Sequence, residues 1–66
     1  MNLKTARKNA GLTLEQAAIQ FGISKPTMFR YEHGLTRIPL NMAVKIRDVY
    51  NLTNNQLIAL VEKESA

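Results

Sequence analysis

The chain has 66 residues with a formal net charge of +4, one histidine and no cysteine. This length fits one small domain over residues 1–66, and the lack of cysteine excludes a disulfide framework and a cysteine-based zinc site, so neither a metal nor a cofactor is expected. No apolar run approaches the roughly 20 residues of a membrane span and no signal peptide is visible, which predicts a cytoplasmic protein without a membrane partner.

The residue pattern predicts an all-α fold of five short helices. The first helix covers about residues 2–10, and Gly11 suits the left-handed position that ends a helix. Its apolar face is Leu3, Ala6 and Ala10. The second helix begins at Thr13, which forms a capping box with Gln16, and it ends at Gly22. Its apolar face is Leu14, Ala17, Ala18 and Phe21.

The third helix follows after the short connection over residues 22–24. Ser24 is its expected N-cap, and Pro26 is tolerated because N–H groups of the first turn have no intrahelical partner. Met28 and Tyr31 point inward, and Gly34 ends the helix.

A linker over residues 35–39 leads to the fourth helix, expected over about residues 41–50. Its apolar face is Met42, Ala43, Ile46, Val49 and Tyr50. A second capping box, between Thr53 and Gln56, begins the fifth helix, which runs to about Lys63.

Two short helices joined by a three-residue turn that contains glycine match the helix-turn-helix geometry. The tight turn makes the second and third helices cross at a steep angle. The third helix then projects outward and can enter the major groove of DNA, while the second lies across the phosphates.

The outer face of the third helix carries two cations and a histidine but no acid. With Met28 and Tyr31 inward, it consists of Lys25, Pro26, Phe29, Arg30 and His33. Arg30 can pair with O6 and N7 of guanine, and Lys25 can reach a base or a phosphate. Phe29 and Pro26 can contact thymine methyl groups, and Thr27 is placed to touch a methyl group or a phosphate.

Phosphate contacts are expected at helix starts and near the end of the third helix. Thr13, Ser24 and Asn41 each begin a helix, where N–H groups that no cap occupies can bind phosphate. His33 and Arg37 are further candidates. Alternatives stay open: Lys25, Arg30 and Arg37 as solvated charges, Phe29 as a core residue, and His33 as a surface residue that favours the helix dipole.

Arg7 lies four residues after Leu3, on the inward edge of the first helix, where a charge needs a partner. Glu32 lies four residues after Met28, on the inward edge of the third helix. We therefore expect an Arg7–Glu32 ion pair with a structural role.

The basic residues are concentrated in the first two-thirds of the chain. Up to Arg47 there are eight Lys and Arg against two acids, and from Asp48 onward one base against three acids. Such a surface attracts polyanions in general, and ordinary solubility charge explains the same excess.

The segment from Gly11 to Ala18, followed by Phe21 to Ser24, resembles the Cro/CI-type repressors, the lambda-repressor-like DNA-binding domains. The segment from Thr27 to Gly34 and the pair Ile38-Pro39 extend this resemblance over nearly the whole chain. It implies a homodimer that binds a palindromic operator and regulates transcription. A chain of this length without a second domain resembles the Cro branch, such as phage or mobile-element regulators.

The resemblance also implies site residues and the Arg7–Glu32 pair. Bases are read by Lys25, Pro26, Thr27, Phe29 and Arg30. Phosphates are held by Thr13, Leu14, His33, Thr36 and Arg37. Leu14 stands where many members have Gln, so only its backbone N–H serves phosphate, and Pro26 and Phe29 shift the readout toward apolar contacts. Dimer contacts are expected from Leu57, Ile58, Leu60 and Val61, unless these fold into the core around Leu52.

Two classes of function compete. One is a sequence-specific transcriptional regulator, and the other is a protein-interaction module, such as an antitoxin or anti-repressor, on the same fold. The basic, acid-free outer face of the third helix favours DNA. An enzyme is not expected, because the sequence has no paired carboxylates, no nucleophile–base pair and no cofactor loop, and no small-molecule substrate is evident.

Overall fold

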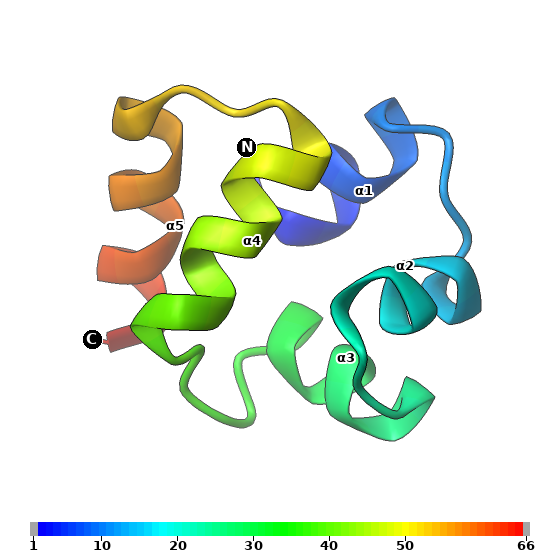
Figure 1. The fold of residues 1–66 in the computed structure, drawn as a ribbon. Coiled ribbons are helices and arrows are strands. Elements are labelled where there is room, and N and C mark those ends of the chain that lie inside the picture. Colours follow the sequence, from blue (N-terminus) through cyan, green and yellow to red (C-terminus); the bar gives the residue numbers. More distant parts are fainter. Residues whose placement is uncertain (1, 66) are drawn as a thin grey trace.

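The computed structural model describes the backbone of residues 2–65 and the side chains of residues 2–59. This backbone forms five helices and no strand, which confirms the all-α prediction (Figure 1). In chain order they are α1 (Leu3–Asn9), α2 (Leu14–Phe21), α3 (Lys25–Glu32), α4 (Leu40–Tyr50) and α5 (Asn54–Ser65).

Side chains at the helix starts define where the helices begin. Thr13 Oγ1 accepts a hydrogen bond from the Gln16 N–H at 3.1 Å, and Gln16 Oε1 accepts one from the Thr13 N–H at 2.9 Å. The same reciprocal pair joins Thr53 and Gln56, at 3.1 and 2.8 Å. Both predicted capping boxes are therefore confirmed, and each fixes the entry of the chain into a helix.

The connection between α2 and α3 turns at Gly22. This residue has φ of +67°, the left-handed conformation that glycine adopts without steric cost. Its N–H bonds to the Ile19 carbonyl, and the N–H of Ile23 bonds to the Ala18 carbonyl. These bonds satisfy the carbonyls of Ala18 and Ile19 while the chain turns, and α3 starts after three residues.

Four details differ from the sequence-based expectations. Helix α4 begins at Leu40, one residue early, and its N-cap is Pro39 without a side-chain cap. Helix α5 extends to Ser65, two residues further than expected. Ala10 is exposed because it lies beyond the end of α1, and Val49 is 36% exposed because it lies at the margin of the apolar stripe of α4.

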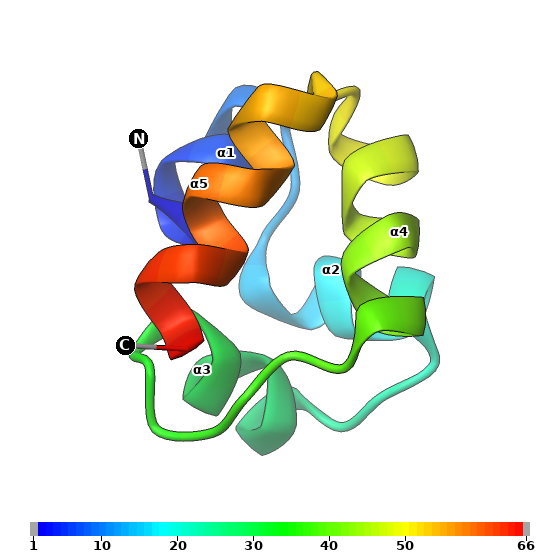
Figure 2. The ribbon, with the colours of Figure 1, turned by 90° about the vertical axis from the view of Figure 1, so that its left-hand side faces the viewer.

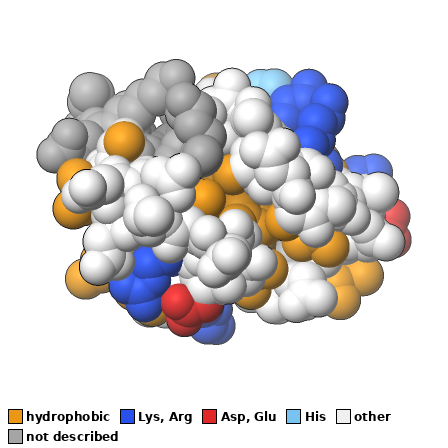
Figure 3. Space-filling view, turned by 90° about the horizontal axis from the view of Figure 1, so that it is seen from above, with side chains coloured by type: hydrophobic (Ala, Val, Ile, Leu, Met, Phe, Trp, Pro, Cys, Tyr) orange, Lys and Arg blue, Asp and Glu red, His pale blue; other side chains and the backbone are white. Residues whose placement is uncertain are grey.

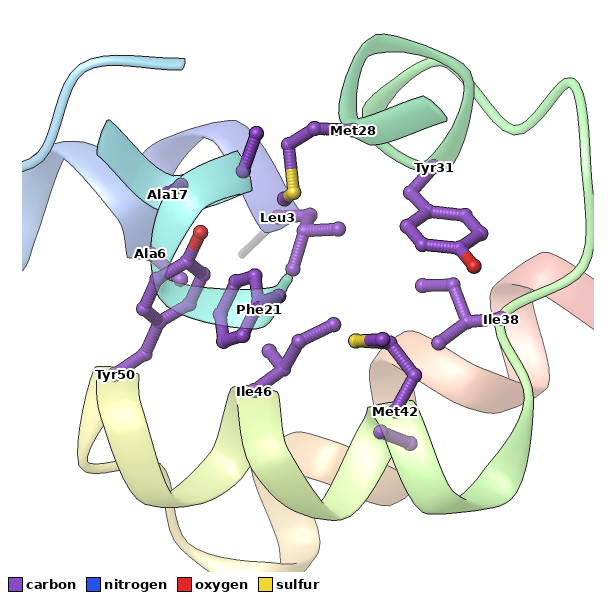
Figure 4. Close-up of a cluster of buried hydrophobic side chains, with 12 residues drawn as sticks. Leu3, Ala6, Ala17, Phe21, Met28, Tyr31, Ile38, Met42, Ile46 and Tyr50 are labelled. Carbon is purple, nitrogen blue, oxygen red and sulfur yellow. The ribbon is translucent and has the colours of Figure 1, made fainter. Parts of the chain in front are cut away.

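The core lies between α4 on one side and α1, α2 and α3 on the other (Figure 4). The rings of Phe21 and Tyr50 meet edge to face, with centroids 5.5 Å apart. Met28 and Tyr31 point from α3 into this core, as predicted. The buried apolar side chains are Leu3, Ala6, Ala17, Ala18, Phe21, Met28, Tyr31, Ile38, Met42, Ala43, Ile46 and Tyr50.

In the described part of the chain, the other helices pack against the inward side of α3, which carries Met28 and Tyr31. Helix α3 packs against α2 and α1, while α5 packs against α4 (Figure 2). In Figures 1 and 2 it lies at the lower edge of the molecule. The fold therefore leaves the opposite side of α3 open to solvent.

A buried ion pair ties α3 to α1. Arg7 Nε lies 2.6 Å from Glu32 Oε2, and Arg7 Nη2 donates to Glu32 Oε1 at 3.4 Å. The side chains are only 10% and 3% exposed, and Arg7 Nη1 also donates to the Leu12 carbonyl at 2.9 Å. The guanidinium thus joins α1, the loop that follows it and α3 through charge-assisted hydrogen bonds.

The hydroxyl of Tyr50 is buried beside this pair. Among the described residues it has no hydrogen-bond partner. Burial raises the pKa of Tyr50 well above its usual range; the Glu32 carboxylate raises it further, and the Arg7 guanidinium acts in the opposite direction. The neutral phenol is therefore strongly favoured in the folded protein.

Removing one member of the ion pair is expected to destabilise the fold far more than removing both. Arg7→Met leaves the Glu32 carboxylate buried without its partner and should cost about 3–5 kcal/mol. The double variant Arg7→Met/Glu32→Leu should recover much of this loss, because it buries apolar groups of similar volume. Urea unfolding of both single variants and the double variant measures the coupling. Additive losses would contradict it.

Tyr50→Phe is expected to stabilise the protein by about 1 kcal/mol, because it removes a buried hydroxyl without a partner. Folding raises the pKa of Tyr50, so the unfolded protein loses the phenol proton at a lower pH than the folded protein. The contribution of this group to the free energy of unfolding is therefore constant below the unfolded-state pKa of about 10 and falls as the pH rises above that value. Urea unfolding between pH 7 and pH 11 should show a steeper alkaline loss in the wild type than in the variant. If the free energy of unfolding falls equally with pH in both proteins, the raised pKa of Tyr50 is refuted.

Candidate nucleic-acid interface

The open side of α3 carries the residues that the sequence analysis places there. All of them are exposed, and Phe29 is 46% exposed, so its interpretation as a core residue is wrong. They are Lys25, Pro26, Phe29, Arg30 and His33. Glu32, the acid of this helix, is turned inward to Arg7. The outward face of α3 is therefore basic and free of carboxylates.

A line of rings runs along the middle of this face. At 3.6 residues per turn, Pro26, Phe29 and His33 follow one another at spacings of three and four residues on the side opposite Met28 and Tyr31. The Phe29 and His33 rings stack, with centroids 4.0 Å apart and planes inclined by 33°. This stack was not predicted from the sequence, although the four-residue spacing of two rings on a helix is a signal for it.

The two cations lie on either flank of the rings. Helical geometry turns Arg30 to one side of the Pro26–His33 line and Lys25 to the other. Figure 3 shows the histidine at the upper edge of one face of the molecule, next to Lys or Arg side chains, and an Asp or Glu beside Lys or Arg side chains at the lower edge. The face of α3 thus combines fixed positive charge with an apolar centre.

Thr27 and Ser24 use their hydroxyl groups within the protein. Ser24 Oγ accepts from the Thr27 N–H at 3.3 Å, and the two hydroxyl oxygens are 2.8 Å apart. Thr27 is also half-buried. Because the Thr27 hydroxyl already has a partner, its methyl group is the more available part of the side chain for an outside contact.

Backbone N–H groups are distributed unequally among the three helix starts. At α3, Pro26 has no N–H and that of Thr27 is capped, so only Lys25 offers one in the first turn. At α2, the capping box leaves the N–H groups of Leu14 and Glu15 without partners among the described residues. The Leu14 side chain is half-buried against the core, so only its backbone can serve an anion.

The start of α4 corrects the expectation for Asn41. Because the N-cap is Pro39, Asn41 lies inside the first turn and does not cap the helix. No side chain caps this start, and the first helical bond runs from the Ala43 N–H to the Pro39 carbonyl. The N–H groups of the residues between them therefore point out of the helix start without intrahelical partners.

The loop between α3 and α4 exposes both of its predicted phosphate contacts, Thr36 and Arg37. It also exposes the apolar side chain of Leu35, at 68%, and the first residue of α4 after the loop, Leu40, is 77% exposed. Ile38, between them, is buried in the core and anchors the loop. The loop is thus anchored at Ile38, and the residues before and after Ile38 are exposed to solvent.

Two of the four predicted dimer contacts on α5 lie among the described side chains. Leu57 is half-buried and packs against the core, and Ile58 is 52% exposed. The side chains of Leu60 and Val61 lie outside the described residues. No helix in the described part of the chain is long and apolar enough to span a membrane.

A family model described as a helix-turn-helix domain matches residues 1–60. The chain belongs to this helix-turn-helix family. Over 48 residues it is 35% identical to a protein of Pyrobaculum aerophilum that is named as a proposed HTH-type transcriptional regulatory protein. The matched segment covers 73% of this chain but only 19% of that protein. No solved structure matches the chain.

Within this helix-turn-helix domain, α2 and α3 form the motif that the sequence analysis expected, with Gly22 at its turn. The family match does not distinguish the Cro/CI-type group from other helix-turn-helix domains. The predicted site residues lie on α3, at the starts of the neighbouring helices and in the loop that follows α3.

Proposed function

We propose that this helix-turn-helix domain binds double-stranded DNA as a transcriptional regulator, with α3 in the major groove. The observation that carries this proposal is the outward face of α3. It is exposed, free of carboxylates and centred on rings between Lys25 and Arg30. A face of this kind suits the major groove, whose base edges offer guanine acceptors to an arginine and thymine methyl groups to apolar side chains.

The proposed base contacts are Lys25, Pro26, Thr27, Phe29 and Arg30. Arg30 pairs with guanine, Phe29 and Pro26 lie against thymine methyl groups, and Lys25 reaches a base or a phosphate. Thr27 contributes its methyl group, since its hydroxyl is bonded to Ser24. The readout thus depends more on apolar contacts than on side-chain amides.

Phosphate contacts are proposed on both sides of α3. On one side are the N–H group of Leu14 at the start of α2 and the adjoining hydroxyl of Thr13. On the other side are His33 at the end of α3, followed by Thr36 and Arg37. Ser24 is a weaker candidate than its position suggests, because Pro26 and the capped Thr27 leave one amide at that helix start.

We further propose a homodimer on a palindromic operator, acting as a repressor of the Cro/CI type. One module with so few base contacts binds weakly, and two half-sites one helical turn apart add their binding energies. Exposed apolar side chains support a second copy as the partner. They are Leu35 in the loop, Leu40 at the start of α4 and Ile58 on α5. Leu60 and Val61, which the sequence adds as dimer contacts, lie outside the described side chains.

Selection from random duplex DNA by the purified chain tests the function. We expect a palindromic consensus bound at least about 10³-fold more tightly than a scrambled duplex at physiological salt. Recovery of no consensus, with weak and strongly salt-dependent binding, would refute sequence-specific recognition. The protein-interaction alternative would then be tested by searching for a protein partner.

Arg30→Ala and Arg37→Ala are expected to affect binding differently. Loss of Arg30 should cost about 1–3 kcal/mol on the selected duplex and relax the preference at one base pair. Loss of Arg37 should weaken binding to every sequence and reduce the salt slope by about 1. The matched control is Arg47→Ala, because Arg47 is engaged with Asp48 and Asn54 between α4 and α5. Affinities across a panel of single-base variants and salt concentrations measure both effects, and equal losses on all sequences for Arg30→Ala would contradict its base-reading role.

A further inference from the structure

The stack of Phe29 and His33 is placed where the proposed function needs a base contact. Phe29 lies in the middle of α3, and His33 caps the end of the helix one turn later. Side chains on a helix lean toward its N-terminus, so the ring of His33 reaches back over the turn that carries Phe29. The centroid distance of 4.0 Å and the angle of 33° correspond to two rings in face contact.

This contact lies on the surface and not in the core. Phe29 is 46% exposed and His33 is exposed as well. The stack covers one side of the Phe29 ring and restricts its rotation, while the rest of the ring faces solvent. A restricted aromatic ring loses less conformational entropy when a ligand covers it, so the stack prepares Phe29 for an outside contact.

We propose that Phe29 and His33 act as one unit that reads the C5 methyl group of thymine, with His33 as the positioning residue that holds the Phe29 ring. This inference rests on the proposed binding of DNA by α3. The thymine methyl is the apolar group that the major groove presents to a protein, and a phenyl ring offers no hydrogen bond to the other base edges. Pro26, three residues before Phe29, extends the same apolar surface.

This assignment replaces the phosphate contact proposed above for His33 with a role in positioning the Phe29 ring. A phosphate contact uses the N–H edge of the imidazole and a positive charge, and it contributes to the salt dependence of binding. A positioning role uses the face of the ring. A phenyl ring at position 33 can therefore replace histidine in the second role but not in the first.

The test uses the duplex recovered by selection and copies in which each thymine in turn is replaced by deoxyuridine. Deoxyuridine removes the methyl group and keeps the hydrogen-bonding edges. For the wild type, replacement at one thymine in each half-site should weaken binding about fourfold per half-site, which corresponds to about 0.8 kcal/mol for a buried methyl-sized group. Phe29→Ala should bind the two duplexes equally.

Variants of His33 separate positioning from phosphate binding. His33→Ala should lose most of the discrimination between thymine and deoxyuridine while its salt slope stays that of the wild type. His33→Phe should restore the discrimination. Thermal unfolding of each variant verifies that the fold is retained, which is expected because both side chains are exposed.

Three results would overturn the inference while leaving the DNA-binding function intact. They are a selected duplex in which no thymine replacement matters, discrimination that survives in Phe29→Ala, and a His33→Ala variant that loses affinity equally for both duplexes with a reduced salt slope and no rescue by phenylalanine. Failure of the wild type to select any consensus would instead refute the proposed function itself, and the two failures are therefore distinguishable.

Discussion

The rotation of α3 about its own axis is fixed from inside the protein by the Arg7–Glu32 pair. Glu32, on the inward edge of α3, bonds to Arg7 of α1 through charge, and its side chain is 3% exposed. Met28 and Tyr31 fill the core beside it. Once these side chains face inward, helical periodicity turns Phe29 and its neighbours outward. The residues on the outward face of α3 are thus determined by which side chains have to face the core and Arg7.

The N-caps of α2 and α3 leave different numbers of backbone N–H groups free at the two helix starts. A capping box serves the helix, but it also uses donors that an anion would otherwise bind. In α2 it leaves two amides, whereas in α3 the proline and the Ser24 cap together leave one. The start of α3 is therefore built for a stable helix end more than for holding charge. Under the proposed function, backbone N–H groups at the neighbouring helix starts bind the phosphates, and α3 contacts DNA through its side chains.

Local signals in the sequence were sufficient for most of the fold. Capping boxes and the glycine at position 22 act within four residues, so they could be read directly, and the Arg7–Glu32 pair followed because a buried charge requires a partner. The burial of Ile38 could not be predicted, since a linker has no periodicity. The burial of the Tyr50 hydroxyl beside the ion pair could not be predicted either, because it depends on how three helices meet. The roles of the surface residues depend on a partner that the fold alone does not specify.

The separation of α3 into a held side and an open side bears on how such a domain changes over evolutionary time. Side chains on the open side, such as Pro26 and Arg30, are not part of the buried cluster, so their replacement leaves the packing of the domain untouched. A substitution there alters what is recognised without first lowering the folded population. A few surface exchanges can therefore change which target site such a domain recognises while the buried core stays the same.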